Sequence, residues 1–284
     1  MLELDSTSLA VFTTLAPAGM VAFVVMALLR STVADHAGKR RVDHLLAIPF
    51  LLVLSGFITS TAHLGTPTNA LYVITGAGRS PLSNEVVSVL AFLFLAGSYW
   101  MAAISRDLPR QVAGAWIAAG SVAAIIAVGF TSIAYSIETI PTWNTIYTPL
   151  ALVAGALGAG FLLSEGIYLF AGGLKPTRST VLLVAYALSC LVVLTAMVLL
   201  RIELDTITTF VAKASGLAMG YDVRLGFYAI SSAGALCALF NASFREEIST
   251  KTRLALACAS AFAALWGVFL VRDLFYQTYM TVGV

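Results

Sequence analysis

Charge is what this sequence has least of. Only 11% of its 284 residues are Asp, Glu, Lys or Arg, whereas a soluble domain carries roughly 25%. Hydrophobic residues make up 60% of the chain, and its mean hydropathy is +0.94. Such a chain has too little polar surface to cover a water-facing globule, so a soluble fold is excluded. The net charge of +2, with Lys and Arg scattered along the chain, gives no indication of nucleic-acid binding.

Cysteine is also scarce, and this limits the metal chemistry that the chain can perform. The three cysteines, Cys190, Cys237 and Cys258, all lie within apolar runs, and none belongs to a CxxC pair. Neither an iron–sulfur cluster nor a structural zinc is therefore indicated, and we expect no metal site.

Histidine is equally rare. A haem with two axial histidines needs both at a similar depth in the membrane, but His36 and His44 fall near one end of an apolar run and His63 near the other. We therefore expect no bis-histidine haem; His–Met ligation stays open, although no spacing favours it.

The first residues of the sequence also lack a basic stretch, so we expect no cleaved signal peptide.

What the sequence does have is a series of long apolar runs. A helix needs about 20 mostly apolar residues to cross a bilayer, and the runs are too long for strands of a membrane barrel. We predict an all-α polytopic membrane bundle, one integral membrane domain over residues 1–284. Its eight transmembrane helices are expected at 8–29, 44–63, 86–105, 112–135, 147–171, 179–201, 225–244 and 252–273. The longer loops are 30–43, 64–85 and 202–224, and the small residues of 154–160 predict close helix packing.

The distribution of Lys and Arg predicts the orientation of these helices. Eleven of the 16 basic residues flank the loops after the first, third, fifth and seventh runs, and five flank the others. Because cytoplasmic loops are enriched in Lys and Arg, both termini are expected on the extracytoplasmic side of the cytoplasmic membrane.

Two ionisable residues flank the same outward loop. His63 ends the second run, where Pro67 stops the helix and Gly65 permits a turn. It is either a partner of the helix dipole or a proton acceptor that titrates near neutral pH. Glu85 follows Ser83 and Asn84, either of which can cap the third helix. It either stabilises the first turn of that helix or shares a proton-accepting task with His63.

Other polar residues are weaker candidates. Trp143 and Tyr147 belong to the outward loop before the fifth helix, either as interfacial aromatics or as walls for a flat aromatic ligand. Glu138, in the same loop, is a candidate for a proton path. Glu165 lies towards the cytoplasmic end of the fifth helix, where it either joins a proton path or reaches the inner interface.

Three outward segments together resemble the membrane-anchor subunit of bacterial dimethyl sulfoxide reductase. They are His63-Leu-Gly65-Thr-Pro67, Leu82-Ser83-Asn84-Glu85 and Pro141-Thr-Trp143-Asn144-Thr-Ile-Tyr147-Thr-Pro149. The resemblance extends to helix number and order over the whole chain, and haem-free quinol-interacting anchors of other reductases are similar in architecture.

The resemblance implies an anchor for a molybdopterin catalytic subunit and a ferredoxin-like iron–sulfur subunit, working in anaerobic respiration. It implies that the chain itself holds no haem or iron–sulfur cluster, and that it binds menaquinol and passes electrons to the partner's cluster. In the family, the histidine and glutamate matched by His63 and Glu85 are implicated at the quinol site. The transfer of roles from the family stops at those two positions. From their places in the sequence, Gly65, Pro67, Trp143 and Tyr147 are expected in the quinol pocket, and the site and partner subunits are expected on the extracytoplasmic side.

Two alternatives remain from the residues. A secondary transporter would show inverted repeats and broken helices near the midplane, where Glu165 is the main charged candidate in this chain. The other alternative is an anchor without a working quinol site, against which the presence of both His63 and Glu85 argues.

Overall fold

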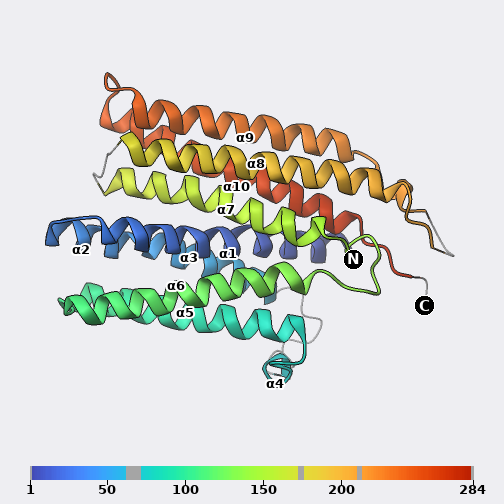
Figure 1. Cartoon of the computed structure of the whole chain (residues 1–284), viewed down its shortest axis with the longest axis horizontal. Helices are drawn as coiled ribbons and strands as arrows, with labels where there is room; N and C mark the ends of the chain where they lie inside the picture. Colours follow the sequence, from blue (N-terminus) through green and yellow to red (C-terminus); the bar gives the residue numbers. More distant parts are fainter. Residues whose placement is uncertain (1, 62–71, 172–175, 210–212, 283–284) are drawn as a thin grey trace.

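The chain folds as a bundle of long helices, seen in a computed structural model that describes residues 2–61, 72–171, 176–209 and 213–282 (Figure 1). No β-strand occurs in these residues. The all-α prediction is therefore confirmed. The helices are α1 Leu2–Ser31, α2 His36–Leu45, α3 Ala47–Thr61, α4 Tyr72–Thr75, α5 Pro81–Ser105, α6 Arg110–Ala134, α7 Tyr147–Phe170, α8 Pro176–Leu204, the 3-10 helix η2 Ala214–Ala218, α9 Tyr221–Phe244 and α10 Thr250–Gln277.

Eight segments of these described residues are long and apolar enough to cross a membrane, which confirms the predicted number. Each has 24 to 28 residues, and a helix of 24 residues is about 36 Å long, enough for a hydrocarbon core of about 30 Å. α2 and α3 together form one of these segments, His36–Thr61. Successive segments run in opposite directions, so α1, α5, α7 and α9 begin at one end of the bundle (Figure 1). We call this end the Glu85 end and the opposite one the Arg30 end.

The polar stretch at the start of the second span was wrongly predicted to be part of a loop over 30–43. The structure forms α2 there, starting at His36, with the Asp35 side chain accepting a hydrogen bond from the backbone N–H of Gly38. Hydropathy locates only the apolar part of a helix, whereas a capped helix continues into water or headgroups. The same reason explains why α1, α5 and α9 begin several residues before their predicted starts.

α1 and α7 form the centre of the bundle. In each span we compared how much of an 18-residue apolar stretch is buried. The buried share is 72% in α1 and 78% in α7, against 22–44% in the other six spans. α1 packs against α3, α6, α7 and α10, and α7 also packs against α8 and α10. Figure 1 shows α5 and α6 on one side of this pair and α8 and α9 on the other.

Glycine allows the central helices to approach each other. A Cβ atom added at Gly160 of α7 would lie 2.5 Å from Val21 of α1, and one at Gly19 of α1 would lie 2.8 Å from the Pro49 carbonyl oxygen of α3. The prediction that 154–160 is a packing segment is confirmed at Gly160, since no larger residue fits there without moving α1.

The outer surface of the bundle is apolar where lipid would lie. Phe94, Ile125, Leu188 and Phe262 are large side chains from four different helices, and each is between 58% and 73% exposed. A soluble protein would aggregate through such a surface, whereas a bilayer solvates it.

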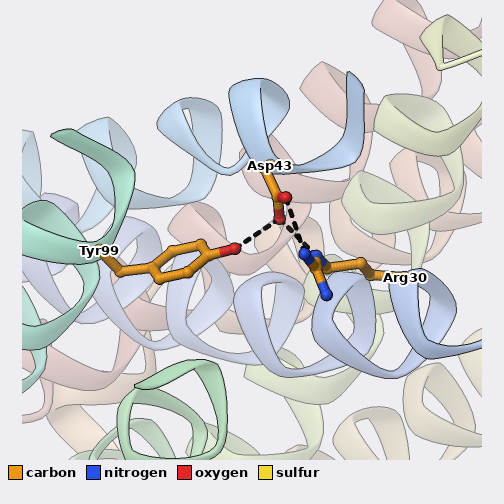
Figure 2. Close-up of polar contacts among 3 residues, drawn as sticks. All are labelled: Arg30, Asp43 and Tyr99. Carbon is orange, nitrogen blue, oxygen red and sulfur yellow. Dashed lines mark hydrogen bonds and ion pairs between the residues drawn. The ribbon is translucent and has the colours of Figure 1, made fainter. Parts of the chain in front are cut away.

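At the Arg30 end, a polar network joins α1 to α2 and α5 (Figure 2). The Arg30 guanidinium donates from Nε and Nη2 to the two carboxylate oxygens of Asp43, at 2.5 and 2.9 Å. The Tyr99 hydroxyl donates to Asp43 Oδ1 at 2.8 Å. Asp43 and Tyr99 are buried and the Arg30 side chain is 15% exposed, so the carboxylate joins both partners in a largely buried network.

Replacing Asp43 with asparagine is expected to lower the free energy of unfolding by about 3 kcal/mol, because it leaves Arg30 as a poorly compensated cation. Unfolding of the purified chain in mixed detergent micelles measures this loss. Asp107→Asn is the matched control: its pair with Arg40 is at least 45% exposed on both sides, and we expect a loss below about 1 kcal/mol. Equal losses in the two variants would contradict a stabilising network at Asp43.

Candidate functional site

Glu85 is a buried ionisable residue near one end of the bundle. It lies in the second turn of α5 and is only 1% exposed. Neither carboxylate oxygen has a hydrogen-bond partner among the residues that the structure describes. A buried carboxyl group without such partners is costly, so it is a candidate for function rather than for stability.

The expected helix cap near Glu85 was wrong. α5 begins at Pro81 with Ser80 as its N-cap, so Glu85 lies beyond the first turn and Ser83 and Asn84 lie inside the helix. Asn84 instead accepts a hydrogen bond from the backbone N–H of Gly78, at 2.6 Å. Proline at the first helical position sets the start, since its missing N–H would have no partner there. The structural role first considered for Glu85, in the first turn of the helix, is thereby removed.

A buried cation accompanies Glu85. Arg272 of α10 is 2% exposed, and its charge acts on the Glu85 carboxyl without a direct ion pair. The Thr131 hydroxyl of α6 is a polar neighbour of the same carboxyl.

The guanidinium of Arg272 is held by neighbours from two helices. Its Nε donates to the Thr13 hydroxyl of α1 at 3.0 Å, and its Nη2 donates to the Tyr276 hydroxyl at 3.3 Å. The Cζ atom lies 4.4 Å from the Phe275 ring centroid and 5.5 Å from that of Tyr135, distances typical of cation–π contacts. We call Thr13, Glu85, Thr131, Arg272 and Tyr276 the Glu85 cluster. It joins α1, α5, α6 and α10.

Trp143 packs next to this cluster. Its ring stacks on Phe275, with centroids 4.8 Å apart, and its indole N–H donates to the Phe275 carbonyl oxygen at 3.1 Å. Tyr276 lies against it edge-on at 5.6 Å, so one tyrosine contacts both Trp143 and Arg272. Trp143 is 7% exposed and belongs to an aromatic core. Its role as the wall of a ligand pocket stays a prediction.

The other predicted site residues divide into two groups. Tyr147 begins α7 and is half-buried, and Glu138 is exposed in the preceding loop. Both lie at the Glu85 end of the bundle. His63, Gly65 and Pro67 lie outside the described residues; α3 is described as far as Thr61.

Glu165 does not join the Glu85 cluster. It lies 18 residues after Tyr147 on α7, about 27 Å along the helix. It is 1% exposed, and it accepts hydrogen bonds from the Ser179 hydroxyl of α8 and, at 3.5 Å, from the Ser243 hydroxyl of α9. The structure thus separates two buried carboxyl groups by most of the thickness of a membrane.

Sequence reasoning missed Arg272 and Thr131 as neighbours of Glu85. Arg272 was counted there only among the five basic residues that flank the outward loops, although a basic residue within an apolar helix is itself a signal of function. The described residues contain no group of three or more His, Cys, Asp or Glu side chains that could hold a metal ion.

Known anchor subunits are similar to this protein over most of its length. A family model described as DMSO reductase anchor subunit (DmsC) matches residues 1–277. The YnfH subunit of an anaerobic dimethyl sulfoxide reductase of Escherichia coli K12 is 28% identical over 280 residues, covering 97% of this sequence and 95% of the relative. The C subunit of anaerobic dimethyl sulfoxide reductase from the same organism is 29% identical, covering 94% and 91%. The corresponding C subunit of Haemophilus influenzae is 28% identical over 55% of this sequence and 56% of its own length.

Proposed function

From the premise that this chain belongs to the DMSO reductase anchor subunit family, we propose that it binds and oxidises menaquinol at the Glu85 end of the bundle. The two electrons then pass to an iron–sulfur cluster in a partner subunit, and from there to a molybdopterin catalytic subunit. The chain is a multi-pass membrane protein, and the family gives it an anchor role in a molybdoenzyme complex. Quinol chemistry is the further step that we propose.

The observation that carries the proposal is the buried, unpartnered carboxyl of Glu85 near the buried cation of Arg272. Oxidation of a quinol to a quinone releases two electrons and two protons. A carboxylate whose oxygens accept no hydrogen bond from a described residue can accept a proton from a quinol hydroxyl. His63, which precedes Glu85 across one loop, supplies a second proton acceptor in its neutral form.

Arg272 is proposed to balance charge during this reaction. A carboxylate that alternates between charged and protonated forms inside a membrane needs a nearby cation to limit the cost of its charged form. The contacts of Arg272 with Thr13, Tyr276 and Phe275 fix that cation in place. Arg272 is therefore a positioning residue in this account, while Glu85 and His63 meet the quinol.

The setting of the reaction is also proposed. Quinol approaches from the membrane, protons leave on the extracytoplasmic side, and the partner subunits dock at the same side. The metals belong to those partners, and this chain moves little net charge across the bilayer. Glu138 is a proposed exit for protons, whereas Glu165 lies too far along α7 to accept one directly from the Glu85 cluster.

A transporter remains the alternative from another class. It would place charges and broken helices near the midplane. In the described part of the chain, α5, α6, α7, α9 and α10 are each unbroken spans, and the two buried glutamates lie towards opposite ends. These features favour an electron-transfer anchor.

Purification of the intact chain from its own membranes in mild detergent tests the proposal. We expect an iron–sulfur subunit and a molybdopterin subunit to co-purify in fixed proportion, identified by mass spectrometry, with no haem absorbance that scales with the chain. Recovery of the chain alone, with solute flux in vesicles, would support the transporter and contradict the anchor.

A further inference from the structure

A small cavity opens at the Arg30 end of the bundle, far from the Glu85 cluster. It lies between the last turn of α1, the start of α2, the end of α5 and the start of α6, and has a volume of about 170 Å³. Sites for drug-sized ligands typically enclose about 300–1,000 Å³, so this cavity suits a smaller group.

The wall of the cavity is strongly basic. Five permanent cations line it, namely Arg30, Lys39, Arg40, Arg106 and Arg110, together with His36. Only two carboxylates, Asp43 and Asp107, line it as well, which leaves three positive charges in excess.

The two carboxylates are already engaged by arginine. Asp43 accepts both hydrogen bonds from Arg30 and a third from Tyr99 (Figure 2). Asp107 pairs with Arg40 at 3.0 Å. The ion pairs found among the described residues do not include Lys39, Arg106 or Arg110. The cavity therefore presents unneutralised cations around a wall that the buried Asp43 network holds in place.

The surface beside the cavity is apolar. Met101 and Ile104 on α5 and Val112 on α6 are 65%, 44% and 47% exposed, close in sequence to Arg106 and Arg110. A cationic pocket at the end of membrane-spanning helices, flanked by exposed apolar side chains, matches both halves of an anionic phospholipid.

We propose that this cavity binds a phosphate group, and that the headgroup of an anionic phospholipid supplies it. The phosphate lies among Lys39, Arg106 and Arg110, and the acyl chains extend along α5 and α6. Free inorganic phosphate offers the same chemistry without the acyl tails. The site is separate from quinol oxidation and does not depend on it.

The test uses the full-length protein in nanodiscs that contain phosphatidylglycerol and phosphatidylcholine in varied proportion. After gentle release, native mass spectrometry counts the lipids that stay bound. The test variant is Lys39→Gln/Arg106→Gln, which spares the Asp43 network. Arg245→Gln/Lys251→Gln is the control, because it removes the same charge from the same end of the bundle, outside the cavity. Circular dichroism and thermal unfolding confirm that all three proteins fold alike.

We expect wild type and the control to retain phosphatidylglycerol in preference to phosphatidylcholine. The test variant should bind it about 25-fold more weakly, at roughly fivefold for each basic residue removed. In a second arm, inorganic phosphate is titrated into the proteins in phosphatidylcholine alone, followed by phosphorus NMR. Tight phosphate binding that the test variant loses would support the site but identify free phosphate as its ligand. Equal lipid retention by the test and control variants, with no phosphate binding, would overturn the proposal.

Discussion

Replacing Glu85 with glutamine is expected to lower quinol-driven turnover of the purified complex by about 100-fold or more, while turnover with a reduced viologen dye is unchanged. Glutamine keeps the size of the side chain but cannot accept a proton, and a positioned proton acceptor typically contributes roughly 10²- to 10⁴-fold. The dye delivers electrons to the partner subunits directly, so it bypasses this chain. The rate of quinol oxidation under anaerobic conditions measures the effect.

The control for this variant is Glu203→Gln. Glu203 lies at the same end of the bundle, on α8, but is half-exposed and outside the Glu85 cluster, so we expect a change below about twofold. Arg272→Met should also slow quinol oxidation, and adding it to Glu85→Gln should cost little more, since both changes affect one interaction. Normal quinol turnover in Glu85→Gln would remove this carboxyl from the mechanism.

The second large effect is expected at His63. His63→Ala should abolish quinol-driven turnover, again with normal dye activity, because it removes the second proton acceptor of the proposed mechanism. His44→Ala is the matched control, since His44 is exposed on α2 at the opposite end. Retained quinol turnover in His63→Ala, or equal losses in the two variants, would contradict the proposed role.

The spans were predictable from the sequence because bilayer thickness imposes a minimum apolar length. The family was also recognisable from short segments around His63, Glu85 and Trp143. Helix ends were less predictable. α2 lies in a polar stretch, where hydropathy carries no signal, and the capping side chain of Asp35 determines where the helix begins.

The neighbours of Glu85 could not be predicted, because α10 is apolar on all sides. A helix without a polar face does not show which way Arg272 points, and only the packing of α10 against α1 brings Arg272 to Thr13. The same limit applies to Trp143, which sequence alone placed at a headgroup interface or a pocket wall. The structure surrounds it with Phe275, Tyr276 and Tyr135.

Asp43 and Glu165 show the same limit at the opposite end of the bundle. Asp43 fell within an expected loop, yet it joins three helices through Arg30 and Tyr99. Glu165 had no obvious partner on its own helix, and the structure supplies hydroxyl donors from α8 and α9. In both cases the partner is distant in sequence, and helix packing alone brings it close.

Reduction of the iron–sulfur clusters of the proposed partner subunit, in a single anaerobic mixing step, tests the central claim most directly. A reduced menaquinol analogue is mixed with the purified complex, and cluster absorbance is followed for wild type and Glu85→Gln, with dithionite reduction of each sample as the reference. Our account predicts rapid cluster reduction by quinol in wild type, almost none in Glu85→Gln, and full reduction of both by dithionite. Cluster reduction by quinol at the same rate in both proteins would contradict it.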